Sequence, residues 1–265
     1  LLGSTMILLG LGIVMIYSAS AIYAFDRMGD SGYFIKRHLA YLVGGVMLAF
    51  WTASIDYKGL RKHALMILGV SLVLLVFVLI PHIGHSSSGA RRWFKISGFS
   101  FQPSEFLKIT LIFYMADYLE RKSSSLKDLK HTVLPALVVL GISAGLILKQ
   151  PDLGTAVTIS LVIIILFFAA GFNIKHLLAM IAGAIPALAY LMLAKPYRRK
   201  RILAFFHPWD DPRNVGYQII QSFLALGSGG IFGVGLGKSQ QKLFYLPESH
   251  TDFIFSIIGE ELGFV

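Results

Sequence analysis

The amino-acid sequence predicts an all-α protein, a polytopic bundle of transmembrane helices with one long polar loop. Hydrophobic residues make up 55% of the 265 residues and charged residues only 14%, whereas charged residues approach ~25% in soluble domains. Seven apolar stretches are each long enough to cross a bilayer. Because lipid offers the backbone no hydrogen-bond partners, we expect these stretches to be helices.

The expected spans, with allowance for tilt and boundary error, are 5–25, 38–55, 64–81, 104–119, 132–148, 153–171 and 177–194. An eighth apolar segment opens at Asp252 and stops at Val265, and the chain begins at Leu1 inside an apolar run. A spanning helix takes ~20 residues. We therefore expect the chain to be truncated at both ends.

Residues 215–236 are uncharged and form a candidate extra span, but they contain many glycines. Membranes tolerate broken helices where protein or water covers them. The glycines therefore favour a re-entrant or interfacial segment. The choice matters, because a true span would move Asp252 to the opposite membrane face. With no internal repeat or linker, residues 1–265 are expected to form a single integral membrane domain, in which 195–251 is the long loop.

Helix parity divides the loops between the two membrane faces. The face that contains loop 195–251 carries nearly twice as many Lys and Arg residues as the other. The positive-inside rule would place that face in the cytoplasm. The rule applies to short loops, however, and the cations of a long loop can instead bind an anionic ligand. Charge alone leaves the orientation open.

Acidic and basic side chains near the spans are candidate functional residues, because charge at membrane depth is costly and usually functional. Glu105 and Lys108 lie in "QPSEFLKI", three residues apart and therefore on one helix face; an ion pair alone would also explain them. Asp152 in "KQPDLGTA" lies beside Lys149 and has the position of a helix cap. Both explanations stay open for each site.

Two basic stretches are candidates for binding an anion. "GARRWFKISG" contains Arg92, and "KPYRRKRI" contains Arg198 and Arg201. An interfacial aromatic belt or unspecific lipid headgroup binding would also account for them. The stretch "GVGLGKS" is not a phosphate-binding loop, because Phe232 stands where that motif needs glycine.

Asp252 lies in "PESHTDF", where its spacing from Ser249 predicts a capping box. Such a cap contributes only ~0.5–2 kcal/mol. With His250 it would form at most a two-residue metal site, which is weak evidence for a metal. Capping does not explain why, by helix parity, so many charged residues share one membrane face: Arg92, Lys95, Glu105, Lys108, Lys149, Asp152, Arg198, Arg201, Lys242 and Asp252.

Long motifs of the chain closely resemble the SEDS family of bacterial shape, elongation, division and sporulation proteins: "RRWFKISGFSFQPSEFLKI", "KQPDLGTA", "PYRRKRILAFFHPWDDP", "GYQIIQS" and "GLGKSQQKLFYLPESHTDFIFSIIGEELGFV". The cell-division members are the most similar, with elongation and sporulation members as close alternatives. The resemblance implies about ten helices in the bacterial cytoplasmic (inner) membrane, about eight of them represented here. Loops 82–103 and 195–251 would face outward.

The resemblance implies a peptidoglycan glycosyltransferase that polymerises lipid II on the extracytoplasmic face, at the division septum. A class B penicillin-binding protein, divisome proteins and membrane lipids are the expected partners, and Mg²⁺ or Mn²⁺ are candidate cofactors; no nucleotide or nucleic acid is expected. The family motifs assign catalytic roles to Asp252, Glu105 and Lys108, and substrate binding to Arg92, Asp152, Arg198, Arg201 and Lys242. Asn214, Val215 and Gly216 replace a Gly-Ser-Gly of many members, which concerns the local loop conformation.

The implied reaction needs a base and a set of cations. Asp252 would take the proton of the attacking sugar hydroxyl, while Glu105 orients Lys108. Four cations would neutralise the leaving pyrophosphate: Arg92, Arg198, Arg201 and Lys108. Base and leaving group on opposite faces of the sugar predict inversion. Two alternatives remain, a lipid II flippase, which would need charges near the bilayer midplane, and a scaffold that recruits the penicillin-binding protein.

Overall fold

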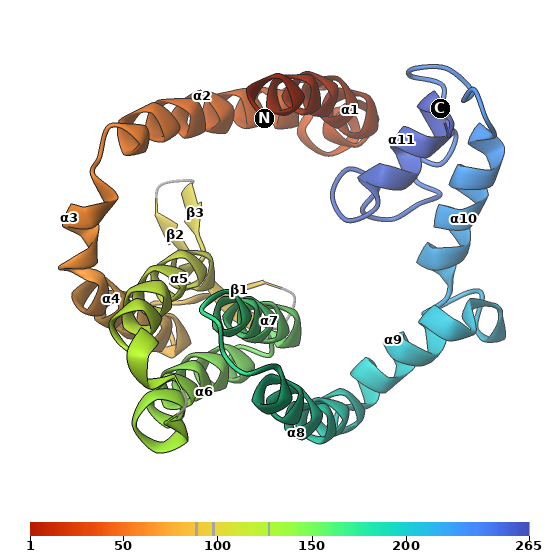
Figure 1. The fold of residues 1–265 in the computed structure, drawn as a ribbon. Coiled ribbons are helices and arrows are strands. Elements are labelled where there is room, and N and C mark those ends of the chain that lie inside the picture. Colours follow the sequence, from red (N-terminus) through yellow and green to blue (C-terminus); the bar gives the residue numbers. More distant parts are fainter. Residues whose placement is uncertain (88–89, 97–98, 127, 265) are drawn as a thin grey trace. The chain divides into compact units, whose positions relative to one another are not determined.

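The computed structural model describes residues 1–264 except 88–89, 97–98 and 127. It is mostly helical and contains two compact units (Figure 1). The first unit comprises Leu1–Ser54 with Met192–Val265, and the second comprises Ile55–Leu191. The single membrane domain expected from the sequence stays a prediction.

Two long helices begin the first unit, α1 (Leu2–Met28) and α2 (Tyr33–Ala53), and they pack against each other. Gly29 ends α1 with a left-handed φ of 70°, a conformation that glycine adopts without steric cost. Asp30 then accepts hydrogen bonds from the Gly32 amide at 2.8 Å and from the Lys36 ammonium at 2.7 Å. These contacts fix the turn between the two helices.

The second unit contains most of the remaining apolar helices and a small sheet. Its elements are α3 (Tyr57–Arg61), α4 (Ala64–Leu79), β1 (His85–Ser87), β2 (Ala90–Ile96), β3 (Phe99–Phe101), α5 (Pro103–Arg121), η1 (Ser123–Ser125), η2 (Leu129–Val133), α6 (Leu134–Lys149), α7 (Leu153–Ala169) and α8 (Ile174–Leu193). Leu107, Leu111 and Met115 of α5 are buried against Ile163 and Phe167 of α7 in the core of this unit.

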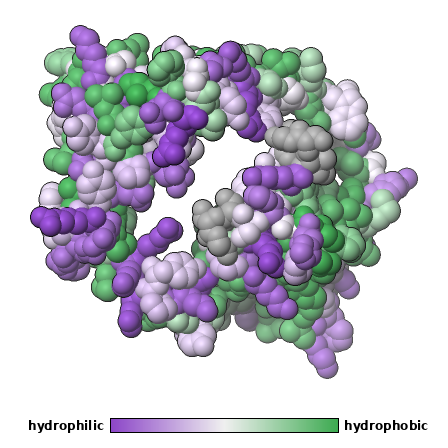
Figure 2. Space-filling model, turned by 180° about the vertical axis from the view of Figure 1, so that it is seen from behind, coloured by the Kyte–Doolittle hydropathy of each residue, from purple (hydrophilic) through white to green (hydrophobic). Residues whose placement is uncertain are grey.

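Each of the seven expected spans coincides with a helix, which confirms the predicted all-α membrane architecture. Three helices are long and apolar enough to cross a membrane, Leu2–Met28, Leu129–Lys149 and Ile174–Leu193, and Ala64–Leu79 and Leu153–Ala169 are shorter apolar helices. Many large apolar side chains lie on the helix surfaces, as the broad hydrophobic areas in Figure 2 show. Lipid is the solvent that suits such a surface.

The sheet in loop 82–103 was not predicted. Strands β1, β2 and β3 form an antiparallel meander in which His85 lies opposite Trp93 and Phe94 lies opposite Phe101. Such cross-strand pairs stabilise a sheet. The loop therefore has a defined structure that presents Arg92 from the middle of β2.

The first unit continues with α9 (Pro196–Phe206), η3 (Pro208–Asp210), α10 (Tyr217–Gly229) and α11 (Ile254–Leu262). Helix α10 has 13 residues, fewer than the ~20 of a spanning helix. Whether residues 215–236 re-enter the membrane stays a prediction. The eighth apolar segment begins as α11, two residues after Asp252, and α11 packs on both α1 and α10.

Candidate functional site

The predicted site residues divide equally between the two compact units. The second unit contains Arg92, Glu105, Lys108 and Asp152, and the first contains Arg198, Arg201, Lys242 and Asp252. In the second unit the structure pairs Arg92 with Asp152 and Glu105 with Lys108. In the first unit Arg198 and Arg201 share helix α9, Lys242 pairs with Glu261, and Asp252 lies in a separate turn before α11. The shared cavity that the sequence suggests stays a prediction.

Arg92 clamps the turn between α6 and α7. Its Nε donates to the Gln150 carbonyl at 2.9 Å, and its Nη2 donates to the Pro151 carbonyl at 2.8 Å. Its Nη1 lies 3.4 Å from the Asp152 carboxylate. This fork geometry is specific to a guanidinium. Arg92 thus holds a turn that lies far away in the sequence, since 59 residues separate it from Pro151.

Asp152 has two roles at this turn. Its carboxylate accepts a hydrogen bond from the Thr155 amide at 3.1 Å and so caps α7, as the sequence predicted. The same side chain is 12% exposed and forms the ion pair with Arg92, whose side chain is 30% exposed. Capping and pairing therefore account for the position of Asp152 without a ligand, and its predicted role in substrate binding stays a prediction.

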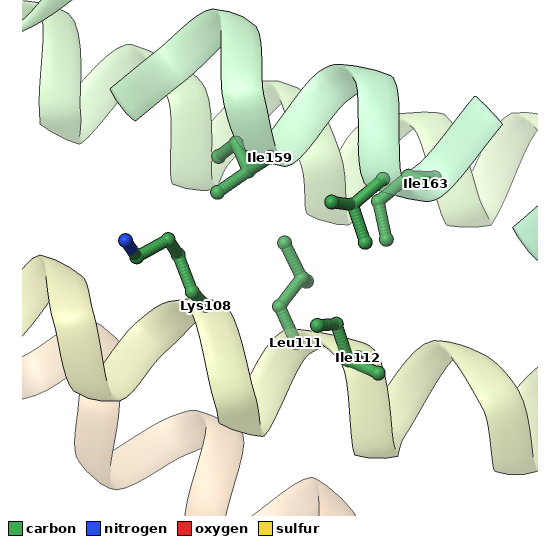
Figure 3. A pocket seen from close by; sticks show the side chains of 6 residues that line it. Lys108, Leu111, Ile112, Ile159 and Ile163 are labelled. Atoms are coloured by element: carbon green, nitrogen blue, oxygen red, sulfur yellow. The ribbon is translucent and has the colours of Figure 1, made fainter. Parts of the chain in front are cut away.

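Glu105 and Lys108 form the predicted ion pair on the first turns of α5, with Nζ and Oε2 2.8 Å apart. Pro103 is the first residue of this helix, a position that suits its fixed φ. The Lys108 side chain also lines a small cavity of about 60 Å³ between α5 and α7. In Figure 3 it lies on α5 beside Leu111, with Ile159 of α7 opposite. Apart from Lys108, the residues that line this cavity are apolar.

Arg198 and Arg201 lie on the first turns of α9, which begins at Pro196. The Arg198 guanidinium lies 5.6 Å from the centre of the Tyr197 ring and donates to the Tyr197 hydroxyl at 3.0 Å. Arg201 is exposed. Both cations are thus held on a short helix of the long loop.

Asp252 lies in an exposed turn directly before α11. Within the described part of the chain, no side chain caps α11, and its N-cap residue is Phe253. The capping box predicted from Ser249 and Asp252 is therefore wrong. The Asp252 carboxylate has no hydrogen bond or ion pair to any described residue.

The residues around Asp252 are anchored although its carboxylate is exposed. The His250 ring stacks on Tyr23 of α1, with ring centres 4.6 Å apart, and lies 5.1 Å from the Phe34 ring of α2. Phe253 packs against a buried cluster that includes Met15 of α1. The turn therefore holds Asp252 at a fixed place on this unit.

A buried polar cluster near the end of the chain was missed as such, although its acids lie in the quoted "GEELG". The Lys242 ammonium donates to the Glu261 carboxylate at 2.7 Å and to the Ser18 hydroxyl at 3.1 Å. Ser239 donates to the adjacent Glu260 carboxylate. Two adjacent acids in an apolar segment are the signal that could have indicated a buried network.

No group of three or more His, Asp or Glu side chains that could hold a metal ion occurs among the described residues. Mg²⁺ is commonly held by one or two carboxylates together with substrate phosphates. The residues described here do not form a metal site by themselves, so we derive no step through a metal. Metal dependence stays a prediction.

The chain matches known proteins along its whole length. The family described as FTSW_RODA_SPOVE, cell cycle protein, matches residues 1–265. A relative from Trichlorobacter lovleyi, named probable peptidoglycan glycosyltransferase FtsW, is 51% identical over 96% of this chain and 67% of its own length. Its counterpart from Geobacter sulfurreducens is 48% identical over 96% and 68%. Stage V sporulation protein E of Bacillus subtilis is 41% identical over 98% and 71%.

Solved structures of related proteins also match the chain. A chain from a structure described as the coordination of polymerization and crosslinking by a peptidoglycan synthase complex matches with a TM-score of 0.68 and 30% identity, over 96% of this chain and 71% of that one. The rod shape determining protein RodA of Thermus thermophilus matches with a TM-score of 0.59 and 28% identity, over 97% and 67%.

Proposed function

The chain belongs to the FtsW, RodA and SpoVE family, the SEDS proteins that its motifs resemble, and we propose that it is a membrane-embedded peptidoglycan glycosyltransferase. Its curated relatives carry that activity in their names. The proposed reaction joins the 4-hydroxyl of one lipid-linked disaccharide to the anomeric carbon of a second lipid II molecule. The proposed setting is septal cell-wall synthesis at the outer face of the bacterial inner membrane.

The assignment of Asp252 as the general base rests on the accessibility of its carboxylate. Its carboxylate is exposed, and no described residue donates a hydrogen bond to it. A general base needs oxygen lone pairs that are accessible to the proton that it takes. Asp152, by contrast, is engaged by Arg92 and Thr155.

The proposed step is a single displacement. Asp252 takes the proton of the attacking hydroxyl as its oxygen forms a bond to the anomeric carbon, and the bond from that carbon to the pyrophosphate oxygen breaks. The pyrophosphate leaves with the bonding electron pair, and the anomeric configuration inverts. A positioned base contributes ~10²–10⁴-fold to the rate of such a step.

Preorganised cations would stabilise the charge on the departing pyrophosphate. We assign this role to Arg92, Arg198 and Arg201, with Lys108 oriented by Glu105. A guanidinium carries five N–H donors, more than the contacts of Arg92 with the α6–α7 turn use. Lys242 is not included, because its side chain is only 5% exposed and pairs with Glu261.

A penicillin-binding protein is the proposed partner. The matching synthase complex is described as coordinating polymerization and crosslinking, and crosslinking is the reaction that a transpeptidase supplies. Divisome proteins and bulk lipid would be further partners at the septum.

The test uses the full-length protein in proteoliposomes with fluorescent lipid II and its penicillin-binding partner. Asp252→Asn should reduce the formation of glycan chains by ~10²-fold or more, whereas Asp26→Asn, an exposed acid of the same unit, should not change it. Substantial polymerisation by Asp252→Asn would refute the assignment of Asp252 as the general base. If the wild-type protein moved lipid II across the bilayer but formed no glycan chains, the result would instead support a flippase.

A further inference from the structure

The segment that carries Asp252 is closed at its two ends by a buried ion pair. Lys242 precedes the segment and Glu261 follows it, and their charged atoms are 2.7 Å apart. The two side chains are 5% and 0% exposed. Ser18 of α1 completes the cluster, because its hydroxyl lies 2.9 and 2.8 Å from the two Glu261 oxygens.

Glu260 holds the same stretch of chain from the neighbouring helical position. Its carboxylate accepts hydrogen bonds from the Gln240 amide at 3.0 Å, from the Gln241 amide at 3.4 Å and from the Ser239 hydroxyl. Successive residues on an α-helix point about 100° apart. The two side chains therefore bind neighbouring parts of the same stretch: Glu260 accepts hydrogen bonds from residues 239–241, and Glu261 pairs with Lys242.

The backbone that precedes this stretch is also hydrogen-bonded to α11. The amides of Val234 and Gly235 donate to the carbonyls of Glu260 and Glu261 at 2.9 and 3.0 Å. A Cβ atom on Gly233 would lie 2.2 Å from the Glu261 carbonyl oxygen, so only glycine permits this approach. The end of α11 is thus the common anchor of residues 233–242.

We propose that Lys242 is a positioning residue, whose buried ion pair with Glu261 and Ser18 holds the segment 243–253 so that Asp252 is presented to the attacking hydroxyl. This inference rests on the proposed function, in which Asp252 is the base. Lys242 acts here through the segment and does not touch the substrate.

Burial decides between this role and direct binding of the pyrophosphate. An ammonium has three N–H donors, and Glu261 and Ser18 take two of them. Removal of one partner from a buried pair leaves the other charge uncompensated, which disrupts the local structure more than removal of both. Replacing both Lys242 and Glu261 should therefore disturb the local structure less than replacing Lys242 alone.

The experiment compares Lys242→Met, the double variant Lys242→Met with Glu261→Gln, and the control Lys238→Met in the full-length protein. Lys238 is an exposed lysine of the same loop. A spin label at Tyr245→Cys, an exposed position, reports the mobility of the segment; residues 1–265 contain no other cysteine.

Lys242→Met should lower kcat by ~10²-fold, the effect of a displacement of about 1 Å at a reacting group, with KM within about twofold and a more mobile label. The double variant should recover at least about tenfold in kcat and a less mobile label, because neither charge of the Lys242–Glu261 pair is then left without its partner. Lys238→Met should match the wild type in both readouts.

Three outcomes would overturn the proposal: a raised KM with unchanged kcat, which indicates substrate binding; lost activity with an unchanged label; or a double variant no better than Lys242→Met. If Lys242→Met does not fold, Ser18→Ala tests the same cluster, and an unchanged kcat and label would reject it. The label reports on the segment whether or not Asp252 is the base, so failure of the proposed function, seen in Asp252→Asn, remains distinguishable.

Discussion

Replacement of Arg92 by lysine should loosen the turn between α6 and α7 while it keeps the positive charge. The guanidinium donates to two carbonyls at once, that of Gln150 at 2.9 Å and that of Pro151 at 2.8 Å. A lysine ammonium is a point donor on a flexible stem. Along the same path a lysine places its Cε methylene where the arginine Nε donates, so the exposed Pro151 carbonyl can keep a donor while the Gln150 carbonyl loses one.

The expected cost follows from the burial of the turn. Gln150 is 1% exposed, so water does not readily replace the lost donor at its carbonyl. A buried acceptor without a partner costs ~1–3 kcal/mol. The partly exposed ion pair with Asp152, at 3.4 Å, adds little, because such pairs contribute ~0.2–1 kcal/mol and lysine retains part of it. Opening of the turn should therefore become easier by about 2 kcal/mol, which corresponds to about 30-fold faster local hydrogen exchange.

Hydrogen exchange followed by mass spectrometry on the peptide that contains residues 149–156 measures this effect. Arg91→Lys is the matched control, because Arg91 is an exposed neighbour on the same strand. Exchange in Arg92→Lys within about threefold of the wild type would refute the reasoning, since ~0.6 kcal/mol is below the cost of any lost buried acceptor.

Three further changes have expected outcomes. The pKa of Asp30 is lowered because Lys36 and the Gly32 amide donate hydrogen bonds to it; its stabilisation is therefore present above the ordinary pKa of ~3.9 and is lost as pH falls through the lower folded pKa. The difference in thermal stability between wild type and Asp30→Asn should vanish on acidification, and a constant difference would contradict this. Gly233→Ala should destabilise the first unit, because φ is 73° and its Cβ would meet a carbonyl at 2.2 Å, whereas Gly227→Ala, with open space around it, should not; equal unfolding midpoints would exclude the close approach. Ser71→Ala should cost ~0.6–1.7 kcal/mol in denaturation in micelles, because the Thr110 hydroxyl donates to Ser71 at 2.9 Å between α4 and α5, and no measurable cost would show that this bond is unimportant.

The helices could be predicted because the membrane imposes a length and a composition on each of them. The predicted span 64–81 coincides with α4 and the span 153–171 with α7. The sheet in loop 82–103 was missed, because short strands outside the membrane are defined by their partners rather than by their own composition. Trp93 and Phe94, interpreted as a possible interfacial belt, pair across this sheet with His85 and Phe101.

The ion pair of Glu105 with Lys108 was predictable because three residues of helix place both side chains on one face. The contact of Arg92 with the α6–α7 turn was not, because 58 residues separate Arg92 from Gln150. The burial of Lys242 was missed for the same reason: its partner Ser18 lies 224 residues away on α1. Sequence periodicity carries no information about such distant pairs.

The capping box at Asp252 was wrong for a reason that bears on its function. A cap is needed where backbone amides at the start of a helix lack acceptors. Here α11 begins only at Ile254 with Phe253 as its N-cap, so Asp252 lies before the helix and not in its first turn. The turn that contains Asp252 is closed by its own backbone, because the Glu248 carbonyl accepts from the amides of Thr251 and Phe253 at 3.1 and 3.2 Å. Because His250 and Phe253 anchor the turn on either side, the chain fixes the place of this carboxylate and leaves its oxygens available to accept a proton.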